Sequence, residues 1–361
     1  MSAYSLTRRR FGQLLGTGAV VAGAAGMMPF RAFAGEEITV LNWQGYGTDE
    51  AWALELFSKA TGITVKHDYF NSEPEMITKL QTNPGAYDVV VVNSARIQQA
   101  VDADLLAPID FSKIPNSKDL APPLKDNANL VVDGTTYGCA WVWGMNALGV
   151  KETIDPLPDS FAVLGDPAYA GRVALFDDAV TEIGIAALLT GQNINAPTDM
   201  DAIRKVLESW KPNVKLLWSS EDQWNKAFAA GEFDVSVYWS GAAVRSRRNF
   251  KLPVEFIVPK EGAVGWLDGL CVPSTSTKQD AAYAFINNMI DPAFYLRWAT
   301  EIGAPASANV KAMDNLPTDD LNKMIHREEY LTKLQFMAAL PDDTRTAFND
   351  LWTEMKALYA Q

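Results

Sequence analysis

The feature that most constrains the fold is a regular alternation of strand-like and helix-like segments that begins at residue 36. Residues 36–43 ("EEITVLNW") and 63–70 ("ITVKHDYF") are strand-like, whereas residues 49–62 ("DEAWALELFSKATG") have helical periodicity. Residues 87–93 ("YDVVVVN") are almost continuously apolar, which is typical of a strand buried on both faces of a parallel sheet. This alternation predicts an open α/β sheet.

A second alternating set begins after a predicted hairpin centred on Asp133 and Gly134. Extended segments at about 138–146 and 265–273 connect the two sets, so the chain passes between them twice. We expect two lobes joined by a hinge of two strands, with a ligand cleft between the lobes. The expected boundaries are 1–34 for a signal peptide, 35–140 with 268–312 for one lobe, and 141–267 with 313–361 for the other.

The first 34 residues have the composition of an export signal. Arg8, Arg9 and Arg10 precede a weakly apolar run rich in glycine and alanine, and "AFA" at 32–34 fits a cleavage site that requires small residues. The adjacent arginines resemble a twin-arginine signal. The run is too rich in glycine for a good membrane span. We therefore expect a periplasmic protein, cleaved near Ala34 and not embedded in the membrane.

The composition limits the partners of this protein. Hydrophobic residues make up 48% and charged residues 21%, which is typical of a soluble globular chain. The formal net charge of −13 argues against nucleic acid, whose binders need basic patches. Cys139 and Cys271 either form a disulfide, as an exported protein allows, or remain buried thiols, and the sequence leaves this open.

Aromatic and acidic residues gather at predicted strand ends, where open α/β sheets bind their ligands. Trp266 and Asp268 share one face of an apolar strand, and we expect a partner opposite Asp268 because an unpaired buried charge is very costly. Each residue also has a purely structural interpretation, as a core aromatic or as a helix cap. The other candidates at strand ends are Trp43, Tyr46, Asp177, Asp178, Glu182, Tyr238 and Trp239.

Aromatic faces combined with carboxylates suit an organic cation. Ring faces attract cations by about 2 kcal/mol when water is excluded. A carboxylate supplies the countercharge and charge-assisted hydrogen bonds. A neutral sugar also stacks on tryptophan, but it has less need of several acids. The sequence therefore predicts a positively charged small molecule as the ligand.

Over most of the mature chain, the sequence resembles the polyamine-binding group of periplasmic solute-binding proteins, which serve ABC importers. The resemblance implies a two-lobed α/β fold of the type II periplasmic binding protein class. It also implies a monomer without enzymatic activity, cofactor or metal, which delivers a polyamine or related small organic cation to a membrane permease. The motifs that carry it are "NWQGY", "ELFSKATGITV", "AYDVVVVNSARI", "YGCAWVWGMNALGV", "FDDA", "YWSGAA", "VPKEGAVGWLDGLCVP" and "EIGAPASAN". The ligand contacts that it implies are Trp43, Tyr46, Asp178, Trp239, Trp266 and Asp268.

Two departures from the family pattern bear on the ligand. Gln44 and Gly45 stand where polyamine binders tend to carry an acid, and Ser94 and Arg96 follow a strand where they often show tyrosines. One end of the cleft has thus lost negative charge, which suggests a shorter ligand than a long diamine. Helix N-termini favour anions, so the alternative ligand is a compact zwitterion with its carboxylate toward Ser94 and Arg96. Examples are a betaine, a dimethylsulfoniopropionate-like compound or a γ-aminobutyrate-like compound. Arg96 can equally be a solvated helix residue.

An exported enzyme on the same fold is the remaining alternative. Asp178 with Glu182 or Asp268 would form an acid–base pair on a sugar, and Cys139 would be a nucleophile. The thiol has no evident base, and the sequence has no Ser-His-Asp pattern, zinc spacing or nucleotide-binding loop. Glu182 also lies one residue further from Asp178 than the family spacing. Together with Ser94, Arg96 and Asp177, it completes the candidate ligand residues.

Overall fold

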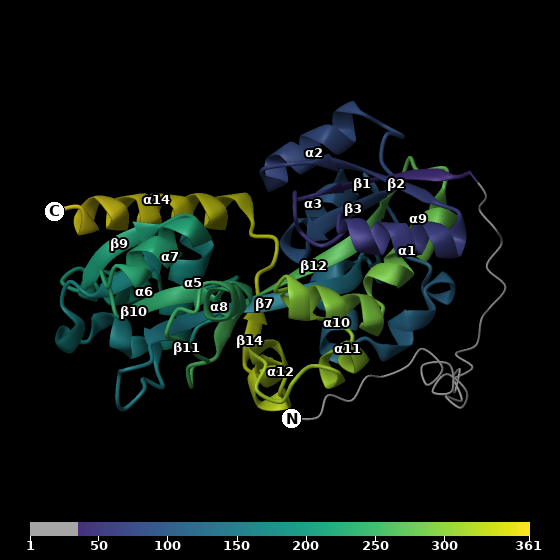
Figure 1. Cartoon of the computed structure of the whole chain (residues 1–361). Helices are drawn as coiled ribbons and strands as arrows, with labels where there is room; N and C mark the ends of the chain where they lie inside the picture. The colour runs from purple at the N-terminus through teal and green to yellow at the C-terminus, as the bar shows by residue number, and fades with distance from the viewer. Residues whose placement is uncertain (1–34) are drawn as a thin grey trace, which may run out of the picture.

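The computed structural model describes residues 35–361, so the expected signal peptide and its cleavage site lie outside the described residues. Figure 1 shows two bodies of helices and strands, joined in the middle by the long strands β7 (Cys139–Lys151) and β12 (Ala263–Pro273). The two-lobed α/β architecture expected from the alternation is confirmed. Within residues 35–361, no helix is both long and apolar enough to cross a bilayer.

The first body, called lobe 1, is built on the predicted parallel strands. β1 pairs in parallel with both β2 and β3. Residues Val89, Val90, Val91 and Val92 of β3 are at most 1% exposed, as expected for a strand covered on both faces. The elements of this body are β1 (Glu37–Asn42), α1 (Ala51–Thr61), β2 (Thr64–Tyr69), α2 (Glu73–Thr82), β3 (Val89–Asn93), the 3₁₀ turn η1 (Ser94–Arg96), α3 (Ile97–Asp102), β4 (Leu106–Ala107), α4 (Pro122–Lys125), β5 (Val131–Val132), β6 (Thr135–Thr136), α9 (Gln279–Met289), α10 (Pro292–Glu301) and α11 (Val310–Asp314).

The second body, called lobe 2, repeats the alternation. β8 pairs in parallel with β9 and β10, and β10 pairs with β7 in antiparallel fashion. The C-terminal helix α14 packs on α5 and α6, away from the strands that it follows in sequence. The elements of lobe 2 are β8 (Val173–Phe176), α5 (Ala179–Leu189), α6 (Met200–Ser209), β9 (Val214–Trp218), α7 (Glu221–Ala229), β10 (Val235–Trp239), α8 (Ser240–Asn249), β11 (Val254–Ile257) and α14 (Asp342–Tyr359).

The strands that connect the lobes make the sheet continuous. β12 pairs antiparallel with both β7 and β3, so the strand order runs β2-β1-β3-β12-β7-β10-β8-β9 through both lobes. The pairing of β12 with β7 shifts between Asp268 and Gly269, which marks a bulge. A bulge breaks the strict alternation of faces and redirects nearby side chains. The extra residue is Trp141 of β7, so Asp268 lies on β12 opposite this bulge.

The C-terminal region departs from the expectation that it is mostly helical, because it contains two strands too short to leave a pattern. β13 (Ala306–Ser307) pairs with β7, and β14 (Leu334–Phe336) pairs in parallel with the start of β12. The helices α12 (Leu321–Ile325) and α13 (Glu328–Leu331) lie between these strands. Residues 337–341 then lead to α14, and in Figure 1 this segment rises between the two bodies. Residues 337–341 thus form a third connection between the lobes, in addition to the two that the sequence indicates.

The two cysteines, whose pairing the sequence left open, are free and buried. Burial raises the pKa of the Cys139 thiol to about 12, so this thiol stays protonated at neutral pH. The predicted hairpin at Asp133 and Gly134 is confirmed, since both residues adopt positive φ between β5 and β6. The exact lobe boundaries given above remain a prediction.

Candidate ligand site

A pocket of about 700 Å³ lies between the lobes, beside β12. In lobe 1 its walls come from the loops after β1 and β3 and from the start of α2; in lobe 2 they come from the loops after β8 and β10. The carboxyl ends of parallel strands from both lobes thus meet at this pocket, which is where α/β sheets bind ligands. A cavity of this size holds a small molecule.

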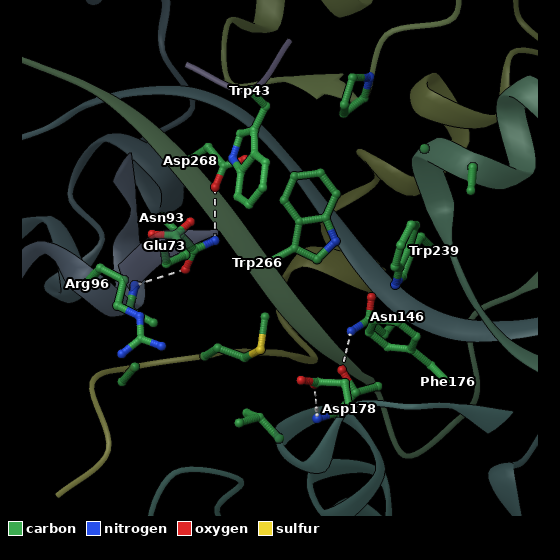
Figure 2. A pocket seen from close by; sticks show the side chains of 18 of the residues that line it. Trp43, Glu73, Asn93, Arg96, Asn146, Phe176, Asp178, Trp239, Trp266 and Asp268 are labelled. Carbon is green, nitrogen blue, oxygen red and sulfur yellow. Dashed lines mark hydrogen bonds between the residues drawn. The ribbon is translucent and has the colours of Figure 1, made fainter. Parts of the chain in front are cut away.

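Three tryptophans line the pocket, and Figure 2 shows Trp43, Trp266 and Trp239 in succession along it. Trp43 follows β1 and packs edge-on against Phe70, with 4.5 Å between ring centroids. Trp239 ends β10 and packs edge-on against Phe176, with 4.9 Å between centroids. These contacts hold the indole rings in place, so the pocket presents aromatic surface without the entropic cost of ordering it on binding.

The position of Trp266 depends on a glycine of the neighbouring strand. Trp266 on β12 lies across from Gly144 on β7. A Cβ atom at Gly144 would lie 2.3 Å from Cζ2 of Trp266, far inside van der Waals contact. Only glycine lets the indole lie against β7 in this way.

Asp268 has the partners that its burial requires. Asp268 is only 7% exposed to solvent. The Tyr46 hydroxyl donates to Oδ2 at 2.8 Å, and the Asn93 amide Nδ2 donates to Oδ1 at 2.9 Å. Burial raises the pKa of Asp268, and these two hydrogen bonds oppose the rise by stabilising the carboxylate. The sequence analysis predicted a partner for Asp268 but did not identify Asn93 as that partner.

Asp178 has both of the roles considered for it. It is the N-cap of α5, where its Oδ2 accepts from the backbone N–H of Thr181 at 2.8 Å. It also lines the pocket, on the side formed by lobe 2 (Figure 2). The same carboxylate therefore caps the helix and lines the pocket, because α5 begins close to the end of β8.

Four of the predicted residues lie outside the pocket lining. Asp177 turns toward α14, where its Oδ1 accepts from Nε1 of Trp352 at 2.8 Å and pairs with Nζ of Lys356 at 3.0 Å. Glu182 is fully buried, and its Oε1 accepts from the backbone N–H of Phe176 at 2.7 Å. Burial raises its pKa well above the usual value, because the ionised form is disfavoured inside the lobe.

The third residue outside the lining is Ser94, the first residue of η1, which is 2% exposed. Its neighbours Asn93, Ala95 and Arg96 line the pocket instead. A carboxylate held by Ser94 and Arg96 together is therefore not available from this geometry. Tyr238 likewise belongs to the core, stacked on Trp224 with 3.6 Å between ring centroids.

An acid that the sequence analysis missed is Glu73, the first residue of α2. It lines the pocket, and burial together with the nearby Asp268 raises its pKa to about 7, while Arg96 opposes the rise. A signal was present, because the helix that begins at Glu73 follows β2 and so starts at the same edge of the sheet.

Cationic residues also reach the pocket. Arg96 was predicted, whereas Arg245 from α8 and Arg345 from α14 were not. The guanidinium of Arg245 is neutralised by Glu221, with Nε 3.0 and 3.1 Å from the two carboxylate oxygens. Arg345 forms an ion pair with Asp342 of its own helix. Among the described residues 35–361, the Arg96 side chain makes one hydrogen bond, at 3.5 Å to Oε1 of Gln99.

The third connection completes the wall. Met337, Ala338 and Leu340 line the pocket from the segment between β14 and α14. The backbone of Met337 is held from both sides, since its N–H donates to the Gly265 carbonyl at 2.9 Å and its carbonyl accepts from Nδ2 of Asn129 at 3.0 Å. This segment was not expected in the site, because no local pattern shows where an irregular stretch will run.

Comparisons with known proteins agree with this architecture. The model of the bacterial extracellular solute-binding protein family matches residues 52–323. The spermidine/putrescine-binding periplasmic protein of Escherichia coli is 30% identical over 298 residues, covering 81% of this chain and 82% of that protein. The putrescine-binding periplasmic protein SpuD of Pseudomonas aeruginosa is 26% identical, covering 97% of this chain and 99% of that protein.

Solved structures give the same fold. The spermidine/putrescine ABC transporter substrate-binding protein PotD of Streptococcus pneumoniae aligns with a TM-score of 0.80 at 24% identity, covering 90% of this chain and 99% of that one. The match of the family model extends over most of the chain and includes both connecting strands. The chain therefore belongs to the family of bacterial extracellular solute-binding proteins.

Proposed function

We propose that this protein captures a polyamine or related small organic cation in the periplasm and delivers it to the membrane permease of an ABC importer. The observation that carries the proposal is Asp268, a buried carboxylate with both oxygens bonded, set among tryptophans in a pocket between two lobes. The two hydrogen bonds favour the ionised carboxylate and hold it in position for a positive charge. The names of the relatives from Escherichia coli and Pseudomonas aeruginosa support the same ligand class.

The ligand is bound at both ends in this proposal. One cationic group lies near Asp268 of β12, and the opposite end of the molecule lies toward Asp178 of lobe 2, with the indole of Trp266 between them. Cation–π contacts and charge-assisted hydrogen bonds are strongest when water is excluded. Movement of the lobes about β7 and β12 closes the pocket over the ligand and gives the permease a closed form to recognise. The protein acts as a monomer and is exported through its twin-arginine signal.

A compact zwitterion is the second candidate, because the guanidinium of Arg96 lines the same pocket. Its carboxylate would pair with Arg96, and its cationic group would occupy the tryptophan-lined end. An enzymatic role has less support. Cys139 is buried with a pKa of about 12, and Glu182, one of the two partners considered for Asp178, lies outside the pocket lining.

Isothermal titration of the mature protein tests the proposal, with putrescine, spermidine, γ-aminobutyrate and maltose as ligands. We expect the diamine and the triamine to bind, and maltose not to bind. Asp268→Asn and Trp266→Ala should each weaken binding by about 2 kcal/mol, or roughly thirtyfold. Asp201→Asn, at an exposed carboxylate on α6, is the control and should leave affinity unchanged. Binding of maltose in preference to every amine would refute the proposal.

Arg96→Ala separates the two ligand classes. If the ligand is a zwitterion, the loss of Arg96 weakens the binding of γ-aminobutyrate and leaves the binding of putrescine unaffected. If the ligand is a polyamine, removing this positive charge leaves putrescine binding equal or stronger. Mass spectrometry of the ligand after incubation distinguishes a receptor, which returns it intact, from an enzyme, which does not.

A further inference from the structure

The loop after β1 gives the pocket no acid, since Gln44 and Gly45 stand there, but α2 supplies one. Glu73 lines the pocket as the first residue of that helix. Its Oε2 is buried and has no hydrogen-bond partner among residues 35–361, and no salt bridge to Glu73 occurs in that range. A buried carboxylate oxygen without a donor is costly. This cost falls if a ligand provides the donor.

The groups that face Glu73 come from three elements. Asp268 lies on β12, and Arg96 lies at the end of η1. The third group is the N-terminus of α2, the helix that Glu73 itself begins. In Figure 2, Glu73 and Asp268 lie on the same side of the pocket, with Asn93 beside them. Arg96 and the helix end favour the ionised carboxylate, whereas burial and Asp268 disfavour it.

The hydrogen bonds around Asp268 define what the two acids can bind. Each oxygen of Asp268 already accepts one donor, from Tyr46 or Asn93. One further acceptor site remains on each oxygen, and Glu73 adds an oxygen with no donor. A primary ammonium has three N–H donors and a full positive charge, so it matches this set of acceptors. A quaternary ammonium has no N–H and leaves these remaining acceptor sites without donors.

We infer that Glu73 is a second ligand carboxylate, which together with Asp268 binds one primary ammonium group of the ligand. The inference rests on the proposed function, because it assigns a chemical group to one end of that same pocket. It also explains how the site does without an acid at Gln44 or Gly45: the charge comes from α2 instead. The pocket therefore selects for a free amine at this end and against N-methylated cations.

In this arrangement, ligand binding is coupled to the release of a proton from Glu73. Burial and the charge of Asp268 raise the pKa of Glu73 to about 7, so roughly half of the molecules hold this proton at pH 7. An ammonium between the two acids lowers that pKa and expels the proton. Alkyl ammonium groups keep their own protons at this pH, since their pKa is about 10. Each ligand bound at pH 7 should release roughly half a proton.

Titration calorimetry with putrescine at pH 7, in phosphate and in Tris buffer, measures this release from the difference in heats. We expect the wild type to release roughly half a proton per putrescine and Glu73→Gln to release far less. Glu73→Gln should also bind about tenfold more weakly or worse, because it loses a charge-assisted contact. Glu75→Gln is the matched control, at an acid on the same helix that does not line the pocket. Glu73→Asp keeps the charge and should retain most of the release.

A second comparison uses 1,4-bis(trimethylammonio)butane, which has the charges of putrescine without N–H donors. The wild type should bind it at least tenfold more weakly than putrescine, and Glu73→Gln should reduce this preference. If wild-type protein binds putrescine while Glu73→Gln retains the same affinity and proton release, the inference is overturned and the proposed function stands. If the wild type binds no amine at all, the proposed function fails and the inference fails with it.

Discussion

The phenolic oxygen of Tyr46 lies 2.8 Å from Oδ2 of Asp268, although 222 positions separate the two residues in the sequence. Tyr46 comes from the loop after β1 in lobe 1, and Asp268 lies on β12 opposite the bulge in β7. Burial and the charge of Asp268 raise the pKa of Tyr46 well above its usual value, so the hydroxyl stays protonated and donates. This contact ties an aromatic wall of the pocket to its central carboxylate.

Tyr46→Phe should weaken cation binding by about 1–2 kcal/mol, because Asp268 loses one of its two donors. The missing hydrogen bond lets the pKa of Asp268 rise further, so the carboxylate is more often protonated in acid. The loss of affinity should therefore be larger at pH 5 than at pH 8. Calorimetry with putrescine at both pH values measures the effect, and Tyr137→Phe, outside the pocket lining, is the control. An equal loss at both pH values would contradict this explanation.

Glu73 should make the stability of the free protein depend on pH. Its pKa is about 7 in the folded protein against the usual 4.5, so the folded state binds this proton more tightly than the unfolded chain. The stability from this group is full below pH 4.5 and is lost as the pH rises through 7. Glu73→Gln removes this loss of stability, so its free energy of unfolding should exceed that of the wild type by about 3 kcal/mol at pH 8.

Urea unfolding at pH 5 and pH 8 tests this expectation. The difference between wild type and Glu73→Gln should be small at pH 5, where the carboxyl group is protonated in the folded protein. Glu75→Gln should show no such pH dependence. A difference that is the same at both pH values would mean that the pKa of Glu73 is not raised.

The two roles of Asp178 can be separated by two substitutions. Asp178→Asn keeps a good N-cap for α5 and removes the charge, so it should preserve stability and weaken putrescine binding by about tenfold. Asp178→Ala removes both, and should also cost about 1 kcal/mol of folding stability. Thermal unfolding measures the stability of the two variants, and calorimetry measures their affinity for putrescine. If Asp178→Asn binds putrescine as well as the wild type, the carboxylate serves only the helix.

Gly144→Ala should displace Trp266, because the added methyl group would lie 2.3 Å from its ring. We expect a loss of at least tenfold in putrescine affinity, with a destabilisation of about 1–3 kcal/mol from overpacking. Gly269→Ala on β12 is the control, since its added methyl group would meet no atom closer than 3.4 Å. Tryptophan fluorescence should change on ligand addition in the control and not in Gly144→Ala. Unchanged affinity in Gly144→Ala would show that the position of Trp266 does not matter for binding.

Much of the fold and part of the site followed from local sequence patterns. The alternation of strands and helices depends on periodicity within short segments, and it predicted β1 to β3 and β8 to β10. The rule that ligands bind at the carboxyl ends of parallel strands then indicated Trp43, Asp178 and Trp239, all of which line the pocket. These residues could be predicted from the sequence because each follows directly after, or ends, a recognisable strand.

Adjacent residues show where local patterns stop being informative. Asp177 and Asp178 are indistinguishable in the sequence, yet the first faces Trp352 of α14 and the second caps α5 at the pocket. The difference arises because the backbone turns at the helix N-cap, so consecutive side chains point to different parts of the molecule. Which part each one meets depends on where α14 packs.

The sequence by itself determined the class of the fold, the edge at which ligands bind, and the aromatic and acidic character of that edge. Only the tertiary structure decided the partners: Asn93 and Tyr46 on Asp268, Glu73 beside it, and the wall formed by Met337. The physical reason is that periodicity acts over a few neighbouring residues, whereas these contacts join segments far apart in the chain. Their geometry depends on strand register, on the bulge in β7 opposite Asp268 and on the packing of both lobes together.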